Sequence, residues 1–369
     1  MTLRNLSLSL SLSLLCATTV CAATANTDLI KGKQAAESKG FVFEASPDEI
    51  VAKAKQEGSL RVIYSFEPET MKAFKEGFAK KYPFINLYFE EITGTDSAQR
   101  FLMEMRAGRA SHWDLTHLSS EFYNDYSPYL EKVDLLGMAQ QGVLQIQPQM
   151  IHPKNRNALA AATILGGIAY NKKLLPPHQV PKTWEDLLKP EYKGKKFLAE
   201  LRSSTLAGLI PAQGKEWVLD YARKIAAQEP IWVRGATRFL TAVNTGEYAL
   251  HSSAYYHTVI RLKQKGAENL EVILPEPVPV RLNQPYGMVK GAKNRHAAML
   301  FLEYICSAEG QRIIDEIEPQ KSSIYFPGAK VEQLLRGKKL SVAGWDEFDK
   351  MGSYTEEIFQ AFGMPQGKK

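Results

Sequence analysis

The chain has few cysteines and no long apolar run beyond its first residues. Its 369 residues include three cysteines, and two of them, Cys16 and Cys21, lie among the first 25 residues. Removal of that segment leaves Cys306 alone, which excludes an internal disulfide. The apolar run around Cys306 is typical of a buried helical cysteine. No later segment reaches the roughly 20 apolar residues that span a bilayer, so we expect no transmembrane helix.

Recognisable enzyme signatures are also missing. The sequence contains no Gly-x-Ser-x-Gly elbow, no P-loop, no His-Glu-x-x-His and no Gly-x-Gly-x-x-Gly after a predicted strand. His112 and His117 are five apart and His251 and His257 are six apart, so neither pair has the i, i+4 spacing of a helical zinc site. We therefore expect no catalytic residues and no cofactor. An exported enzyme with scattered catalytic residues is the less favoured alternative.

The charge balance limits the partners. The formal net charge is +6, from 46 basic and 40 acidic residues. A mildly basic surface of mixed sign is compatible with anionic ligands, but it is too weak to indicate nucleic-acid binding. We expect a small-molecule or ion ligand, no nucleic acid, and a monomer.

The first residues predict export. Arg4 precedes an uncharged leucine-serine stretch from Leu6 to Leu15, and Ala23-Thr24-Ala25 supplies a small-x-small cleavage site. This is the pattern of a secretory signal peptide over 1–25, which predicts a periplasmic protein. A lipid anchor at Cys16 or Cys21 is the alternative, in a poor sequence context.

The next part of the chain predicts alternating strands and helices. Residues 26–45 are polar and carry no clear period, so we interpret them as an extension. Ser46-Pro47-Asp48-Glu49 is a strong helix start, and that helix should end at Gly58. The pattern then gives strands at 60–64, 84–92 and 114–118, with helices at 68–81 and 94–108. Such alternation predicts a mostly parallel sheet with helices on both faces.

A second α/β set follows an expected crossing between the lobes at 165–171, which Gly166 and Gly167 make adaptable. It contains strands at 197–200 and 230–233 and a helix at 216–228. The proline-rich residues 275–279 indicate a return connection, followed by a strand at 286–289 and one long helix at 296–314. Two lobes are therefore expected. Their predicted bounds are 26–58 for the extension and first helix, 59–166 plus 283–369 for lobe 1, and 167–282 for lobe 2.

Two adjacent tyrosines, Tyr255 and Tyr256, precede a predicted helix that stops at Gly266. Adjacent residues on a strand point to opposite faces, so both phenols can serve one site only where a strand turns into a helix. A phenolate pair suits a hard trivalent cation. Because a phenol ordinarily has a pKa of about 10, only a strongly charged bound cation could keep both ionised near neutral pH.

Several segments together resemble bacterial extracellular solute-binding proteins of ABC importers. They are Ala169-Tyr-Asn-Lys-Lys-Leu-Leu175, Pro181-Lys-Thr-Trp-Glu-Asp-Leu-Leu188, Tyr192-Lys-Gly-Lys195, Val289-Lys-Gly-Ala-Lys-Asn294 and Phe301-Leu-Glu-Tyr-Ile-Cys-Ser-Ala-Glu-Gly-Gln311. Within that superfamily the chain looks most like the ferric-ion-binding branch, because Tyr255-Tyr256 falls where those proteins carry a tyrosine pair. The resemblance covers roughly residues 59–315.

The resemblance implies a type II periplasmic-binding-protein clamshell, an α/β fold of two lobes. The ligand would bind between the lobes, and the closed form would be presented to an inner-membrane ABC permease. Fe(III) would be a transported ligand, with Tyr255 and Tyr256 as the metal ligands. The chain departs from the branch after the first predicted strand, where Phe66-Glu67 stands in place of a histidine or tyrosine. It departs again after the third strand, where Ser119 stands in place of a glutamate.

The remaining candidates lie where strands end and helices begin, because ligands of open α/β sheets gather there and helix N-termini favour anions. The predicted ligand-binding residues are Tyr255, Tyr256, Glu67, Phe66, Thr95, Ser97, Ser119, Ser203, Ser204 and Arg234. Two ligand classes remain open: ferric iron with a companion anion, or an organic anion such as a phosphonate or carboxylate without metal. A chemosensory role for the same clamshell is a third alternative.

Overall fold

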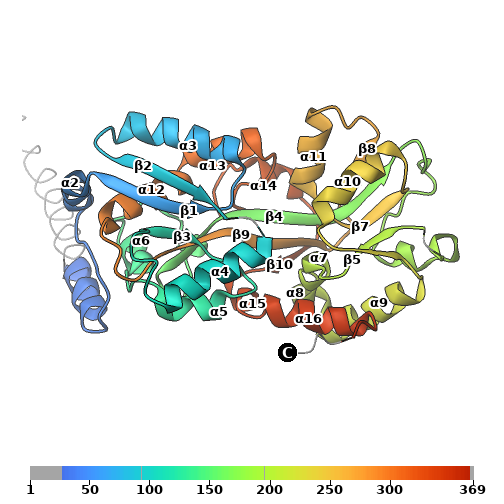
Figure 1. The fold of residues 1–369 in the computed structure, drawn as a ribbon, viewed down its shortest axis with the longest axis horizontal. Coiled ribbons are helices and arrows are strands. Elements are labelled where there is room, and N and C mark those ends of the chain that lie inside the picture. Colours follow the sequence, from blue (N-terminus) through green and yellow to red (C-terminus); the bar gives the residue numbers. More distant parts are fainter. Residues whose placement is uncertain (1–26, 93, 195, 366–369) are drawn as a thin grey trace, which may run out of the picture.

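The computed structural model describes residues 27–365 except 93 and 195, so the predicted signal peptide lies outside the described residues. The molecule is elongated, with one lobe at each end and long strands running between them (Figure 1). In the described part of the chain ten strands form one mixed sheet, in the order β2-β1-β3-β9-β4-β7-β5-β6, with β10 on β9 and β8 on β4. Nowhere in those residues is a helix long and apolar enough to cross a bilayer.

Lobe 1 is built around parallel pairing of β1 with β2 and β3. Helices cover both faces of this part of the sheet (Figure 1). One face packs on α3 and α12 through Phe74, Phe78 and Phe301, and the other packs on α4 through Phe101 and Leu102. The elements of lobe 1 are α2 (Pro47–Glu57), β1 (Ser59–Tyr64), α3 (Pro68–Lys81), β2 (Asn86–Glu91), α4 (Gly94–Arg106), β3 (Leu115–His117), α5 (Tyr123–Tyr126), α6 (Leu135–Gln140), α12 (Arg295–Cys306) and α13 (Ala308–Ile317).

Lobe 2 repeats this layering around β7, which pairs with β4 and β5. One core packs below α10 and α11 through Leu240 and Val259, and the other packs on α9 through Val218 and Tyr221. The elements of lobe 2 are β5 (Leu198–Glu200), α7 (Ser204–Ala207), α8 (Ile210–Gln213), α9 (Lys215–Ala227), β6 (Ile231–Val233), α10 (Ala236–Thr245), β7 (Leu250–Tyr255), α11 (Tyr256–Gln264) and β8 (Leu270–Ile273).

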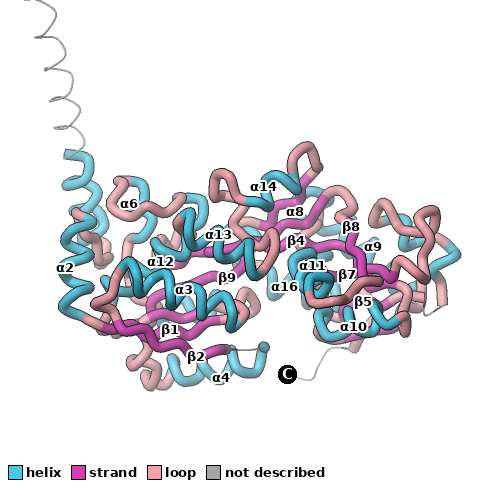
Figure 2. The backbone as a smooth tube through the Cα atoms, turned by 90° about the horizontal axis from the view of Figure 1, so that it is seen from above, coloured by secondary structure: helices cyan, strands magenta, loops and turns pink. Residues whose placement is uncertain are grey.

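Two long strands join the lobes. β4 (Ala158–Asn171) pairs with β9 (Val278–Met288) over its first half and with β7 and β8 over its second half. In the view from above, β4 and β9 run from the middle of lobe 1 towards lobe 2 (Figure 2). β10 (Leu340–Ala343) extends the sheet beside β9, and α14 (Lys330–Leu335) and α15 (Trp345–Phe348) flank it in sequence.

Gly166 and Gly167 of β4 are required for close packing, whereas we had expected them to make the crossing adaptable. A Cβ on Gly166 would lie 2.6 Å from Cγ2 of Thr205, and one on Gly167 would lie 2.4 Å from the carbonyl oxygen of Ile273. Both contacts are shorter than real Cβ atoms make. The glycines therefore let neighbouring segments of lobe 2 approach the strand.

Two further predictions differ from the structure. The single helix expected at 296–314 is two helices, because Ser307 adopts an extended backbone and caps α13 by accepting the Gly310 N–H. The last helix, α16 (Met351–Ala361), packs on α7 and α9 of lobe 2 through Met351 and Ile358, although 283–369 had been assigned to lobe 1.

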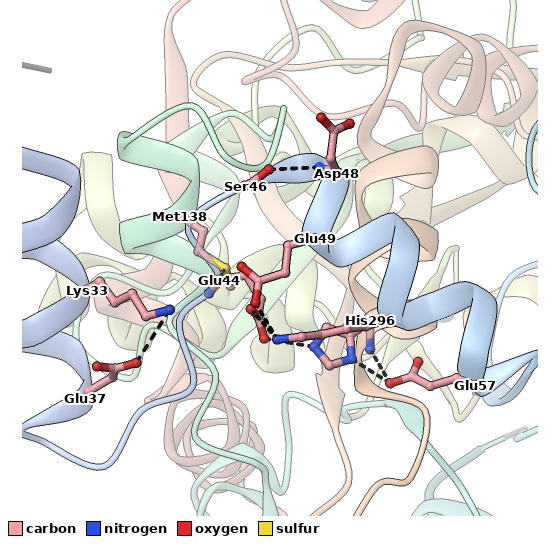
Figure 3. Close-up of polar contacts among 10 residues, drawn as sticks. Lys33, Glu37, Glu44, Ser46, Asp48, Glu49, Glu57, Met138 and His296 are labelled. Atoms are coloured by element: carbon pink, nitrogen blue, oxygen red, sulfur yellow. Dashed lines mark hydrogen bonds and ion pairs between the residues drawn. The ribbon is translucent and has the colours of Figure 1, made fainter. Parts of the chain in front are cut away.

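The residues before β1 are ordered against lobe 1. Residues 27–37 are helical, and Val42 forms a β-bridge with Val133. Ser46 caps α2 and Gly58 ends it at φ +65°, as the sequence predicted. Figure 3 shows His296 of α12 between two glutamates, with Nδ1 2.6 Å from Glu57 and Nε2 2.8 Å from Glu44. This buried cluster ties the N-terminal segment to the lobe.

The His296 cluster changes the pKa values of its members. Burial lowers the pKa of His296, but the hydrogen bonds to Glu57 and Glu44 outweigh it and raise the pKa above its ordinary value. Burial raises the pKa of Glu44, yet Lys53 and His296 lower it to about 2. Cys306 of the same helix is buried, as predicted, and burial followed by the nearby Glu303 carboxylate raises its pKa well above the ordinary value.

Candidate functional site

A cavity of about 530 Å³ lies between the lobes and is lined by both. Lobe 1 contributes the loops after β1 and β3 and the start of α4. Lobe 2 contributes the junction of β7 and α11, and β9 forms part of the wall. The lining residues are Ser65, Glu67, Ile92, Gly94, Ala98, His117, Ser119, Ser120, Glu121, Ile164, Tyr255, His257, Thr258, Arg261, Arg281, Asn283, Gln284 and Lys321.

The tyrosine pair lies where a strand turns into a helix, since β7 ends at Tyr255 and α11 begins at Tyr256. Tyr255 lines the cavity, and its hydroxyl lies 2.9 Å from the hydroxyl of Ser204. Tyr256 does not line it. That ring is half-buried against the apolar cluster around Leu165 and Val278, and burial, then Glu271, raises its pKa. The structure therefore separates the two phenols.

Arg281 of β9 is the main cationic partner of Tyr255. Its Nη2 donates to the Tyr255 hydroxyl oxygen at 3.3 Å, and its guanidinium carbon lies 5.5 Å from the ring centroid. In the described part of the chain no carboxylate forms an ion pair with Arg281. A charge-assisted donor of this kind, next to a phenol in a cavity, suits an anion or an oxygen that carries negative charge.

The other two cations of the cavity are already paired. Arg261 of α11 forms an ion pair with Glu67, so this contact joins lobe 2 to the loop after β1 in lobe 1. Lys321, in the turn after α13, forms a buried ion pair with Glu318. Glu318 also accepts hydrogen bonds from the Thr70 hydroxyl at 2.9 Å and the Glu67 backbone N–H at 3.2 Å.

Two histidines of the cavity wall are neutral at physiological pH. Burial, followed by the Lys321 ammonium, lowers the pKa of His117 to about 3. Burial, followed by Lys321, Arg261 and Arg281, lowers the pKa of His257 well below its ordinary value. Both rings can therefore offer a neutral nitrogen to a ligand over the whole physiological range.

In the loop after β1 the two predicted residues face different surroundings. Glu67 lines the cavity and makes no side-chain cap to α3. Phe66 is buried in the lobe 1 core, 5.4 Å from the ring of Phe74 and 6.3 Å from the ring of Tyr286. The apolar ring packs inward because successive residues of an extended segment point to opposite sides. Phe66 therefore does not reach the cavity.

Of the predicted hydroxyl-bearing residues, some line the cavity and others do not. Ser119 lines the cavity together with Ser120 and Glu121. Ser97 does not, although Gly94 and Ala98 of the same helix do, and the side chain of Thr95 lies outside the described residues. Ser203 is buried as the N-cap of α7, where it accepts the Leu206 N–H at 3.2 Å. Ser204 contacts the cavity only through Tyr255.

Arg234, the predicted anion partner, is exposed between β6 and α10 and does not line the cavity. Two arginines do line it, Arg261 of α11 and Arg281 of β9, and neither was predicted; Lys321, Asn283 and Gln284 were missed as well. All but Arg261 come from β9 and from the turn after α13, which lie beside Tyr255 only in the folded chain. The one available signal was the polar alternation of Arg281 and Asn283 in an otherwise apolar strand. Among the described residues no group of three or more His, Cys, Asp or Glu side chains could hold a metal ion.

Comparison with known proteins gives related sequences. The chain is 30% identical to "Iron uptake protein A1" of Synechocystis sp. over 163 residues, which are 40% of this chain and 44% of that protein. The match therefore spans less than half of that relative. The chain is 22% identical to the "Fe(3+)-binding periplasmic protein" of Serratia marcescens over 266 residues, covering 69% of this chain and 75% of that protein.

Solved structures share the fold. Apo ferric ion-binding protein A of Pasteurella haemolytica superposes with a TM-score of 0.64 at 17% identity, over 82% of this chain and 98% of that one. A Trichodesmium protein in complex with iron and citrate gives a TM-score of 0.61 at 20% identity, over 83% and 99%. At such identities the likeness shows the fold, which is the type II clamshell predicted from the sequence. The sequence profile of the "Bacterial extracellular solute-binding protein" family matches residues 127–351, more than half of the chain, and the chain therefore belongs to that family.

Proposed function

We propose that this protein is the periplasmic substrate-binding component of an ABC importer and captures a ferric ion together with an anion. The observation that carries this proposal is the arrangement of Tyr255, which lines the interlobe cavity and accepts from the guanidinium of Arg281, a group with no carboxylate partner among the described residues. A phenol oxygen is a hard donor suited to Fe(III), and the guanidinium suits an anion bound next to the metal. Relatives named for iron uptake and Fe(3+) binding support the choice of metal.

The charges of the cavity explain why the metal would arrive with an anion. Arg261, Arg281 and Lys321 line the same space as Glu67 and Glu121. Arg261 and Lys321 are paired with Glu67 and Glu318, so Arg281 is the cation that a ligand beside Tyr255 would meet. A bare trivalent cation would be repelled by Arg281, whereas a ferric complex whose ligands carry negative charge would be attracted. The Trichodesmium protein of the same fold was solved with iron and citrate, which is one example of such a pairing.

Capture and delivery require no catalytic group, and we propose that the protein is a binder that hands its ligand to an inner-membrane permease as a monomer. Solute-binding proteins of importers work in this way. The Glu67–Arg261 ion pair joins the two lobes at the rim of the cavity, which gives closure of the lobes a specific contact.

Visible absorption tests the metal directly. Ferric citrate is added to the purified protein, and the ligand-to-metal charge-transfer band of a ferric phenolate is followed during the titration. We expect a saturable band at one ferric ion per protein and its loss in Tyr255→Phe. A protein that stays colourless at saturating ferric citrate would refute iron capture.

An organic anion without metal is the second candidate, and the position of Tyr256 favours it. With that ring packed against the apolar cluster around Leu165, the cavity offers one phenol and not two. Calorimetric titration with iron-free carboxylates and phosphonates in the presence of a chelator separates the two functions. Binding that is undiminished by the chelator identifies the organic anion as the ligand.

A further inference from the structure

Gln284 has a backbone conformation that is rare for its residue type. Its φ is +51°, in the left-handed region, although it lies within β9 and its residue is 2% exposed. A non-glycine residue in this region is strained, and such residues persist where the surrounding structure holds them, often at ligand sites. The position of Gln284 in the cavity wall fits that pattern.

The unusual backbone brings a third β9 side chain to the cavity. Alternate residues of a strand share a face, so Arg281 and Asn283 both line the cavity as expected. Regular alternation would turn Gln284 to the opposite face. Gln284 nevertheless lines the cavity, and its positive φ is what distinguishes it from its neighbours.

In the side-chain amide of Gln284 the nitrogen is hydrogen-bonded, and the oxygen has no partner among the described residues. Its Nε2 donates to the Ser65 carbonyl oxygen at 2.9 Å, which fixes the orientation of the amide. Its Oε1 is then a buried acceptor without a partner among the described residues, and so is Oδ1 of Asn283. A buried acceptor left without a donor destabilises the folded protein, so two of them in one wall are suited to a donor on a ligand.

The neighbouring charges indicate what kind of donor this is. Arg261 and Lys321 are paired with Glu67 and Glu318, whereas Arg281 of β9 forms no ion pair with a carboxylate among the described residues. An ammonium group bound at Gln284 and Asn283 would be repelled by Arg281. A hydroxyl group is a neutral donor and avoids that repulsion. The same arginine that attracts a carboxylate, Arg281, is three residues from Gln284 on the same strand. The residue that would bind a carboxylate and the residues that would bind a hydroxyl group therefore lie close together on β9.

We propose that Gln284 and Asn283 form a hydroxyl-recognising subsite, and that the anion bound in this cavity is a hydroxylated organic acid. The proposal rests on the proposed function, in which this acid is the companion of the ferric ion. Arg281 meets a carboxylate of the acid, and the amide oxygens of Gln284 and Asn283 accept from its hydroxyl. The subsite would thus reject acids that have the same charge but lack the hydroxyl.

Citrate and tricarballylate provide the test, because they carry the same three carboxylates and only citrate has the hydroxyl. Calorimetric titration without iron measures both dissociation constants. For the wild-type protein we expect citrate to bind about tenfold more tightly, which corresponds to about 1.4 kcal/mol. In Gln284→Leu the two acids should bind within about twofold of each other, with tricarballylate binding unchanged within about threefold.

Gln320 supplies a matched control. It also has a positive φ, of +55°, and an unpartnered Oε1, but it does not line the cavity. Gln320→Leu should keep the tenfold preference for citrate. Gln284→Gly, which accommodates the positive φ without strain, should lose the preference without loss of melting temperature and so separates recognition from folding. Equal binding of the two acids by the wild-type protein, a preference that survives in Gln284→Leu, or binding of neither acid would overturn the proposal.

The ferric titration keeps this proposal distinct from the proposed function. A hydroxyl preference without a charge-transfer band would support the subsite and refute iron capture. A charge-transfer band in a protein that does not distinguish citrate from tricarballylate would support iron capture and refute the subsite.

Discussion

The two lobes contribute different chemistry to the cavity that they share. Lobe 2 and the joining strand β9 provide Tyr255, Arg261 and Arg281, a phenol and two guanidinium groups held on regular elements. Lobe 1 provides the loop residues Ser119 and Glu67, His117 at the end of β3, and Lys321 after α13. Its Glu67 and Lys321 are already in ion pairs. From this difference we expect the ligand to bind first to lobe 2 and β9, with lobe 1 closing over it.

The largest effect should come from lobe 2, at the tyrosine pair. Tyr255→Phe removes the phenol oxygen that faces the cavity, so ferric citrate affinity should fall at least about a hundredfold, or about 2.7 kcal/mol, and the visible band should disappear. Tyr256→Phe is the matched control, because that ring packs in an apolar cluster. The affinity of Tyr256→Phe for ferric citrate should change less than about threefold. Equal losses in both variants, measured by absorption titration, would show that both phenols bind the metal.

The next largest effect should come from β9. Arg281→Met keeps much of the side-chain volume but removes the charge beside Tyr255. Anion affinity should fall about tenfold to a hundredfold, in the range of a lost charge-assisted hydrogen bond of about 1.5–3 kcal/mol. Arg234→Met, at an exposed arginine outside the cavity, should have no measurable effect. Calorimetry with citrate checks both variants, and unchanged binding by Arg281→Met would remove β9 from the anion site.

A smaller effect should come from the contact between the lobes. Glu67→Gln and Arg261→Gln each break the ion pair across the cavity rim, and we expect the ligand-free protein to become more open in small-angle X-ray scattering. Ligand affinity should change by only about threefold, because partly exposed pairs contribute about 1 kcal/mol or less. The double variant should resemble the single variants. If the affinity losses of the two single variants add up in the double variant, Glu67 and Arg261 do not act as a pair.

Lobe 1 can be weakened without affecting ligand affinity. His296→Gln removes the charge between Glu44 and Glu57, and the unfolding free energy should fall by about 1–3 kcal/mol at pH 6, with ligand affinity unchanged. The folded pKa of His296 is raised above 6.5, so its contribution is present below pH 6.5 and is lost as the pH rises through the folded value.

The pKa of Glu44 determines the low-pH end of the range in which the His296 cluster stabilises the fold. Its folded pKa is lowered from 4.5 to about 2, so its contribution is present above pH 4.5 and is lost as the pH falls towards 2. Wild-type and variant stabilities should therefore differ most between pH 4.5 and 6.5 and converge at alkaline pH. Urea unfolding at a series of pH values measures this. A difference that does not depend on pH would exclude the charge of His296 as the cause.

Local sequence signals predicted most helices and strands of lobe 1 and the position of Tyr255 at the end of a strand. The cap at Ser46, the stop at Gly58 and the helix over 68–81 lie where the pattern placed them, because caps and amphipathic periods act within a few residues. The strand-to-helix change at Tyr255-Tyr256 was likewise predicted. The long helix at 296–314 was predicted as one element because both halves carry apolar residues, and only the backbone at Ser307 separates them.

The sequence by itself determined the family, the α/β alternation and the presence of Tyr255 at a strand-to-helix junction. These depend on residues close together in the chain. Only the tertiary structure decided that Tyr256 packs away from the cavity, that Arg281 and not Arg234 lines it, and that Gln284 joins the wall. Those outcomes depend on β9 and the turn at Lys321, which reach Tyr255 through pairing with β4 and packing between the lobes. Contacts of that range leave no local period in the sequence, so folding is required to reveal them.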